Sequence, residues 1–238
     1  MKKLLFFLFL LLFAVQNLFS QTNTLITSIN EIKKLLFEKK INEALQYCDE
    51  YILAHQEKAD TVYIKYEKAL IYSDYIKDYD NSIAVLKSTA DDLLNISQPL
   101  TARDELFLSD IYWLIGYNYR WHKKDYNKAV DYFIKIIQDC TNSPKKAEAQ
   151  YSRSWCLALL KRYKDAGDNF KIITERYSNS VYTIRSFYEA GECYQKAEKY
   201  PLAKLMFETL ITGHPQNEWA IAAKQHLKWI ELNYTEEE

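Results

Sequence analysis

The stretch YEAGECYQKAEKYPLAKLMFETLITGHP (residues 188–215) decides the fold. A small residue, Gly191, is followed twelve residues later by a second, Ala203, and then by Phe207 and Leu210 at offsets of four and seven. Such offsets place side chains on one face of an α-helix, so the stretch predicts two helices joined by a tight turn. Because Gly inside a helix costs about 1 kcal/mol relative to Ala, Gly191 indicates that the second helix approaches too closely for a side chain.

The second helix of this hairpin has counterparts at four earlier places in the chain. In each, a large residue is followed by a small residue three positions later, and by larger side chains four and seven positions after that. The small positions are Ala44, Ser82, Ala129, Ala166 and Ala203. Small residues recur in the upstream helices too, at Ala69, Gly116, Ser154 and Gly191. A period of 37 to 47 residues predicts antiparallel helical hairpins that stack as a solenoid.

The fifth hairpin resembles the tetratricopeptide repeat (TPR), a helix–turn–helix motif. It has the motif's Gly, Tyr, Tyr, Ala, Phe and Pro at Gly191, Tyr194, Tyr200, Ala203, Phe207 and Pro215. The fourth and third hairpins match nearly as well and the first two are degenerate, so the resemblance covers about residues 25–232. The 37-residue spacing and the linkers at 177–180 and 214–217 are similar to those of the long-repeat subgroup of bacterial envelope TPR proteins. That subgroup includes the Tol–Pal-associated periplasmic protein and the outer-membrane assembly lipoprotein.

The repeat and the resemblance together imply an all-α fold, a right-handed α-solenoid of about five TPR units plus a C-terminal capping helix. A polar loop near Asn95–Thr101 lies in the longest interval and is the expected hinge or boundary. The turn of the third hairpin, Arg120–Lys124, contains one extra residue. The expected hairpins cover residues 25–58, 61–97, 102–142, 143–179 and 180–216, and the expected capping helix covers 217–233.

Residues 1–20, MKKLLFFLFLLLFAVQNLFS, predict a secretory signal peptide ahead of a solenoid domain of residues 21–238. Two lysines precede an apolar run from Leu4 to Val15, which is shorter than the roughly 20 residues that span a bilayer. An uncleaved anchor is the alternative. No Cys follows the run, so no lipid attachment is expected. We therefore expect a periplasmic or secreted protein with no transmembrane anchor after cleavage.

The composition argues against several classes of function. Without residues 1–20 the chain has 29 basic and 32 acidic side chains, unlike a nucleic-acid-binding protein. Its four glycines form no phosphate-binding loop and no nucleophile elbow. Its four histidines have no metal-ligand spacing, and its four cysteines form no Cys-x-x-Cys motif. We predict no catalytic, cofactor-binding or metal site, no small-molecule cofactor and no nucleic-acid partner.

Aromatic side chains recur on the first helices of the hairpins and form the candidate partner-binding groove. The position three residues before the small residue holds Tyr66, Trp113, Tyr151 and Tyr188, and the position one residue after it holds Tyr117 and Trp155. The family resemblance implies that these positions line a concave face. A row of rigid aromatic rings suits an extended peptide or a partner helix. The alternative is that the rings pack in the core, as aromatic stripes at helical spacing usually do.

These features predict a non-enzymatic exported scaffold that binds another envelope protein, or a peptide segment, through its concave face. Two alternatives stay open. The chain could be a structural component that self-associates or bridges an envelope assembly, which a dimer through the terminal helix would favour. It could also be an accessory subunit of a separate envelope enzyme, which a partner with an active site would reveal.

Overall fold

The computed structural model describes residues 24–56, 59–96 and 99–234. The chain divides between Ile96 and Ser97 into two compact parts, the N-terminal part and the C-terminal part. The division falls in the polar loop that interrupts the regular period of the repeat. The predicted signal peptide lies outside the described residues.

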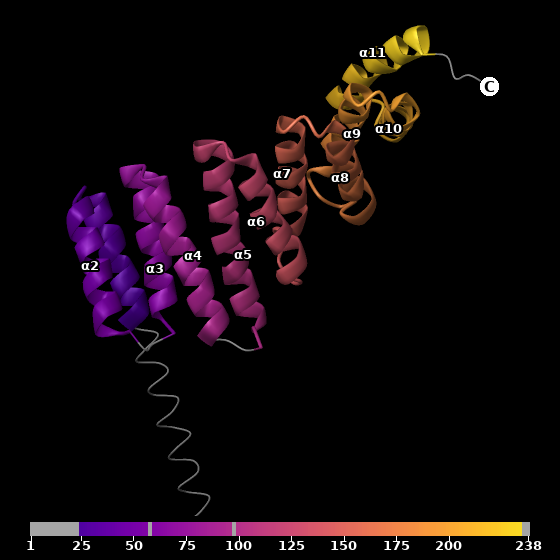
Figure 1. Cartoon of the computed structure of the whole chain (residues 1–238). Coiled ribbons are helices and arrows are strands. Elements are labelled where there is room, and N and C mark those ends of the chain that lie inside the picture. The colour runs from indigo at the N-terminus through magenta and orange to yellow at the C-terminus, as the bar shows by residue number, and fades with distance from the viewer. Residues whose placement is uncertain (1–23, 57–58, 97–98, 235–238) are drawn as a thin grey trace, which may run out of the picture. The chain divides into compact units, whose positions relative to one another are not determined.

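All regular secondary structure of the described residues is helical, which confirms the predicted all-α solenoid. Within each part, helices that follow one another in sequence pack side by side (Figure 1). The N-terminal part contains a helix at residues 24–37, α2 (Ile41–Ala54), α3 (Thr61–Leu70), the π-helix η1 (Ile71–Ile76) and α4 (Tyr79–Ile96). The C-terminal part contains α5 (Ala102–Tyr117), the π-helix η2 (Asn118–Lys123), α6 (Tyr126–Asp139), α7 (Lys146–Leu159), α8 (Tyr163–Arg176), α9 (Thr183–Lys196), α10 (Tyr200–Gly213) and α11 (Glu218–Asn233).

The repeated small residues are the points of closest packing, as the sequence predicts. All five small positions of the second helices are fully buried, and so are Phe133, Phe170 and Phe207 in the apolar position that follows. A Cβ atom added to Gly191 would lie 2.4 Å from Cε1 of Phe207, and one added to Gly116 would lie 2.8 Å from Cε1 of Phe133. The glycines therefore make room for an aromatic ring from the second helix of the same hairpin.

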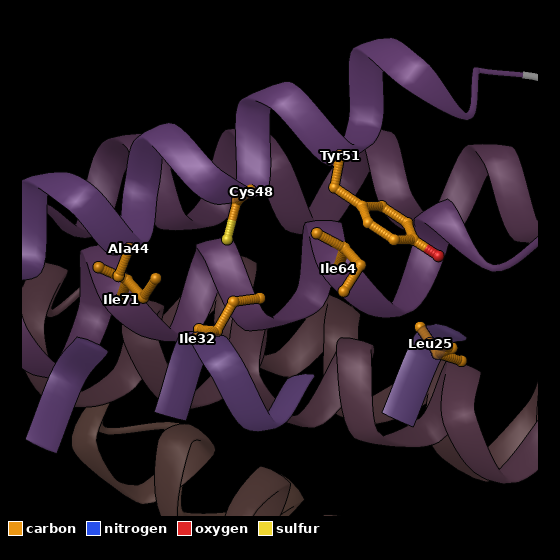
Figure 2. Close-up of a cluster of buried hydrophobic side chains, with 7 residues drawn as sticks. All are labelled: Leu25, Ile32, Ala44, Cys48, Tyr51, Ile64 and Ile71. Atoms are coloured by element: carbon orange, nitrogen blue, oxygen red, sulfur yellow. The ribbon is translucent and has the colours of Figure 1, made fainter. Parts of the chain in front are cut away.

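The N-terminal part buries the same positions with different side chains (Figure 2). Cys48 and Tyr51 of α2 take the places that Phe and Ile hold in the third and fourth hairpins, and both are buried. The cluster is completed by Leu25 and Ile32 of the first helix, Ala44 of α2, Ile64 of α3 and Ile71 of η1. The degenerate appearance of the first two hairpins thus reflects changed side chains in the same packing scheme rather than a different fold.

Each turn between the two helices of a hairpin contains a residue with positive φ, two positions before the second helix begins. These residues are Lys39, Lys77, Lys124, Lys161 and Glu198, with φ between 53° and 65°. This conformation costs a residue other than Gly roughly 1–2 kcal/mol. Its recurrence without glycine indicates that packing of the two helices, not the turn residue, fixes the turn.

The extra residue in the turn of the third hairpin appears as the π-helix η2. Ten positions separate Gly116 from Tyr126, whereas nine separate Gly191 from Tyr200. The second hairpin has the same lengthened spacing and the π-helix η1 at the same place. One inserted residue is therefore taken up as a wider turn at the end of the first helix.

Two sequence patterns predict how helices begin, Thr101-x-x-Asp104 as a capping box and Ser143-Pro144 as an N-cap followed by Pro at the first helical position. Thr101 and Asp104 form the expected capping box, with Asp104 N donating to Thr101 Oγ1 at 3.2 Å and Thr101 N donating to Asp104 Oδ2 at 3.0 Å. The prediction that Ser143 caps a helix starting at Pro144 is wrong, because α7 begins at Lys146. Ser143 Oγ instead accepts from Lys145 N at 3.1 Å and stabilises a preceding turn.

All four cysteines are buried and unpaired, as their spacing suggests. Burial raises the pKa of Cys48, Cys140 and Cys193 to about 12 and that of Cys156 to about 11. The thiolate is the reactive form of cysteine, so these side chains act as packing residues at neutral pH.

Candidate functional site

A cavity of about 670 Å³ opens in the C-terminal part beside the first helices of its three hairpins. Four of the six aromatic residues singled out in the sequence line it. Trp113 and Tyr117 come from α5, and Tyr151 and Trp155 come from α7. The aromatic positions that recur along the repeat are thus brought together around one space.

Each of these rings except that of Tyr117 also rests on a buried Phe side chain of the core. The ring of Trp113 lies 5.3 Å from that of Phe133, and the rings of Tyr151 and Trp155 lie 5.6 and 5.9 Å from that of Phe170. The two buried Phe side chains therefore form a floor that holds the cavity-lining rings. Both interpretations of the aromatic stripe therefore apply to these side chains. One face of each ring packs on the core, and the residue also lines the cavity.

The side of the cavity formed by α9 combines an aromatic ring with a cation. Tyr182, just before α9, stacks on Tyr151 with 4.8 Å between ring centroids. The guanidinium carbon of Arg185 lies 5.9 Å from the ring centroids of both Tyr151 and Trp155, within cation–π range. Arg185 Nε also donates to Oε1 of the buried Glu189 at 3.0 Å. This ion pair holds the guanidinium over the two rings.

Another part of the cavity lining comes from the π-helix η2 and the residues that follow it. Arg120 and Trp121 of η2 line the cavity with Lys124 and Tyr126. The guanidinium carbon of Arg120 lies 4.6 Å from the centroid of the Trp121 ring, which is 56% exposed. Burial lowers the pKa of Arg120, although a guanidinium stays protonated at physiological pH. This side therefore pairs an exposed aromatic surface with positive charge.

Tyr188 lies outside the cavity although it occupies the same column of the repeat. Its ring packs against Trp219 and His226 of α11, at centroid distances of 5.2 and 5.6 Å, and its hydroxyl is 3.1 Å from His226 Nε2. Burial, with the nearby charges of Glu192 and Glu189, raises the pKa of Tyr188 to about 12. The last helix covers the position that would otherwise continue the row.

Tyr66 belongs to α3 in the N-terminal part and is half-buried there. The cavity is formed by residues of the C-terminal part alone. The structure therefore brings Trp113, Tyr117, Tyr151 and Trp155 together and leaves Tyr66 and Tyr188 elsewhere.

Several lining residues were not among those singled out in the sequence. Glu148 and Arg185 lie three positions before Tyr151 and Tyr188, so extending the aromatic column by one helical turn would have found both. Arg120 and Lys124 lie in the lengthened turn of the third hairpin, and the spacing of that turn did not indicate that they face a cavity. Tyr126 belongs to a repeat column, as the large residue three positions before Ala129, but nothing marked that column as facing a cavity. The other lining residues outside the repeat columns are Tyr182, Trp121, Ser152 and Leu159.

Other kinds of site are not evident where the structure describes the chain. Within residues 24–56, 59–96 and 99–234, no three His, Cys, Asp or Glu side chains are grouped to hold a metal ion. Among the same residues, no helix combines the length and the apolar character needed to cross a bilayer.

Comparison with known proteins identifies relatives of the fold but not of the sequence. No protein-family model matches the chain, and no curated protein matches it. Among solved structures, YrrB, described as a TPR protein with an unusual peptide-binding site, aligns over 83% of this chain and 90% of its own. The TM-score is 0.54 and the sequence identity 19%.

Two further solved structures align in a similar way. A tetratricopeptide repeat protein from Parabacteroides merdae has a TM-score of 0.55 and 14% identity over 87% of this chain and 73% of its own. The protein MamA has a TM-score of 0.53 and 14% identity over 89% of this chain and 98% of its own. At these identities the likeness concerns architecture alone, and the fold of this chain is that of tetratricopeptide-repeat proteins.

Proposed function

We propose that the protein is a non-enzymatic scaffold that binds a protein segment in the aromatic cavity of its C-terminal part. The observation that carries the proposal is the convergence of Trp113, Tyr117, Tyr151 and Trp155 on one open space. Aromatic anchors supply much of the binding energy at protein interfaces, because they bury a large area at a low cost in conformational entropy.

The cavity suits an extended chain or a short helix. Tyr117 is 39% exposed and Trp121 56% exposed, so part of the aromatic surface is open to solvent at the cavity mouth. The deeper rings are held on Phe133 and Phe170, which fixes their orientation before a partner arrives. A preformed site avoids the entropic cost of ordering its side chains on binding. YrrB, a TPR protein of similar fold, is described as having a peptide-binding site, which agrees with this proposal.

The proposal includes export of the protein to the periplasm or beyond, where the partner would be another envelope protein. It rests on the two lysines and the apolar run at residues 1–20. N-terminal sequencing of the protein from its source cells is expected to begin near Gln21. A protein that keeps Met1 and stays with the cytoplasmic fraction would contradict the export proposal, while leaving the binding proposal intact.

Truncation of an exposed ring tests the binding proposal. Tyr117→Ala should weaken partner capture by about 30-fold, the equivalent of roughly 2 kcal/mol for an aromatic hot spot. Because the side chain is partly exposed, the melting temperature should change little. The measurement is quantitative mass spectrometry of proteins retained by the tagged chain from an envelope extract, followed by affinity measurement with the recovered partner.

Leu232→Ala is the matched control, since Leu232 is an exposed apolar residue of α11 in the same part of the chain. It should capture as much partner as the unchanged protein. If Tyr117→Ala captures as much partner as the unchanged protein, the cavity does not contribute to partner binding.

A further inference from the structure

Two buried polar atoms at the aromatic cavity lack a hydrogen-bond partner. Among the described side chains, the buried nitrogen and oxygen atoms without one are Arg120 Nε, Tyr151 OH and Arg153 Nε. The first two belong to residues that line the cavity. Buried polar groups in folded proteins are nearly always paired, because an unpaired group loses its hydration and gains nothing in return. The two atoms therefore indicate a site that a ligand completes.

The charged residues around the cavity indicate the sign of the charge on that ligand. Arg120, Lys124 and Arg185 line it, against the single carboxylate of Glu148. Arg185 is already paired with Glu189. The pKa of Arg120 is lowered by burial, and the side chains that partly offset this effect are Cys156, Tyr151 and Tyr126, none of which is a carboxylate. A cavity with more cations than carboxylates favours an anionic group.

The position of Arg120 depends on the inserted residue of the third hairpin. Arg120 and Trp121 lie within the π-helix η2, which exists because the turn is one residue longer than in the fourth and fifth hairpins. The second hairpin has the same insertion in η1, but its sequence there, IYSDYI, contains no cation. The insertion alone therefore does not form an anion site. The positive charge comes from the side chains of η2, in particular Arg120. Such π-helical turns occur frequently at functional sites.

We infer that the cavity recognises an acidic peptide, with a carboxylate of the peptide accepting hydrogen bonds from Arg120 and from the Tyr151 hydroxyl. This inference rests on the proposed function and specifies the chemistry of its partner. An apolar or aromatic side chain next to the carboxylate fills the space between Trp113 and Trp155, which a cavity of about 670 Å³ accommodates. Arg is suited to this role because its planar guanidinium matches a carboxylate. The carboxylate can belong to an Asp or Glu side chain or to a peptide C-terminus.

Selection from random peptide libraries tests the inference with the full chain as target. One library displays peptides fused at both ends, and the other displays them with a free C-terminus. We expect peptides that join an aromatic or aliphatic residue to a carboxylate. Enrichment of Asp or Glu in both libraries would show that the carboxylate belongs to a side chain. Selection of peptides only from the library with a free C-terminus would show that it is the terminal carboxylate. Selection of peptides without any carboxylate preference overturns the inference and leaves the proposed function standing. Failure to select any peptide overturns both.

Charge removal at Arg120 tests the role of that residue in the selected complex. Arg120→Gln keeps a hydrogen-bond donor and removes the charge, so affinity for the selected acidic peptide should fall tenfold or more, in line with charged hydrogen bonds. The Arg120→Gln variant and the unchanged protein should bind a neutral form of the peptide with equal affinity. In this form Asn or Gln replaces the acid, or the C-terminus is amidated. An equal loss for both peptides would overturn the assignment of Arg120 to the carboxylate.

Shortening the turn tests the contribution of the π-helix. Deletion of His122 restores the nine-residue spacing found in the fourth and fifth hairpins, so circular dichroism should show an unchanged helix content. Preference for the acidic peptide over its neutral counterpart should disappear. Deletion of Tyr75 in η1 makes the same change in the second hairpin and should preserve the preference. If the preference for the acidic peptide is the same in both deletion variants, the proposed role of η2 is wrong. If the chain without His122 fails to fold, the Arg120→Gln comparison still tests recognition of the carboxylate.

Discussion

Gly191→Leu is expected to lower the free energy of unfolding by about 3 kcal/mol, at the upper end of the usual cost of overpacking. Even the first added carbon would lie 2.4 Å from Cε1 and 2.6 Å from Cζ of Phe207, well inside van der Waals contact. Phe207 is fully buried and lies against His226 and Tyr188, so its ring has little room to move. Urea unfolding followed by circular dichroism measures the change.

Gly213→Leu provides the matched control for this experiment. Gly213 ends α10, and an added Cβ there meets no atom within 4 Å. Its replacement should leave stability within roughly 0.5 kcal/mol of the unchanged protein. A Gly191→Leu variant as stable as the Gly213→Leu variant would mean that the two helices of the fifth hairpin are not in close contact.

Phe170→Ala is expected to cost about 3–5 kcal/mol, the usual range for removing a buried aromatic ring. Phe170 is fully buried, and the rings of Tyr151 and Trp155 rest on it. The variant should therefore lose stability and also weaken partner binding, because the cavity loses its floor. Denaturant unfolding gives the first effect, and titration with the partner below the unfolding transition gives the second.

Phe37→Ala removes the same side chain where it is 89% exposed, in the helix at residues 24–37, and should change neither quantity. If Phe170→Ala loses stability but binds the partner as well as the unchanged protein, binding in the cavity does not depend on the core beneath it. That result would contradict the role of the buried Phe ring in holding Tyr151 and Trp155 for binding.

The repeat columns made the core predictable from the sequence. Small residues such as Ala166 and Gly191, and the aromatic partners Phe170 and Phe207, recur at helical offsets and are buried as expected. This succeeds because a hairpin in a solenoid contacts mainly its sequence neighbours, so local periodicity carries most of the packing information. The main error at a helix start, at Ser143, arose because a turn uses the same polar-residue and proline signal as an N-cap.

The candidate site was only partly predictable, for two physical reasons. Tyr188 fits the aromatic column, but α11 packs over it, so its environment depends on how the solenoid ends rather than on the repeat. Arg120 faces the cavity because one inserted residue widens a helix into a π-turn. A one-residue change in spacing is visible in the sequence, whereas the direction in which it turns the following side chains is not.

Site-specific photo-cross-linking in the source cells tests the central claim most directly. A photoreactive phenylalanine analogue placed at Tyr117, at the mouth of the aromatic cavity, is predicted to cross-link a distinct partner protein. The same analogue at Leu232, which is 74% exposed on α11, is predicted to give no such product. Cross-linking of the same partner from Leu232 but not from Tyr117 would contradict the assignment of the cavity as the binding site.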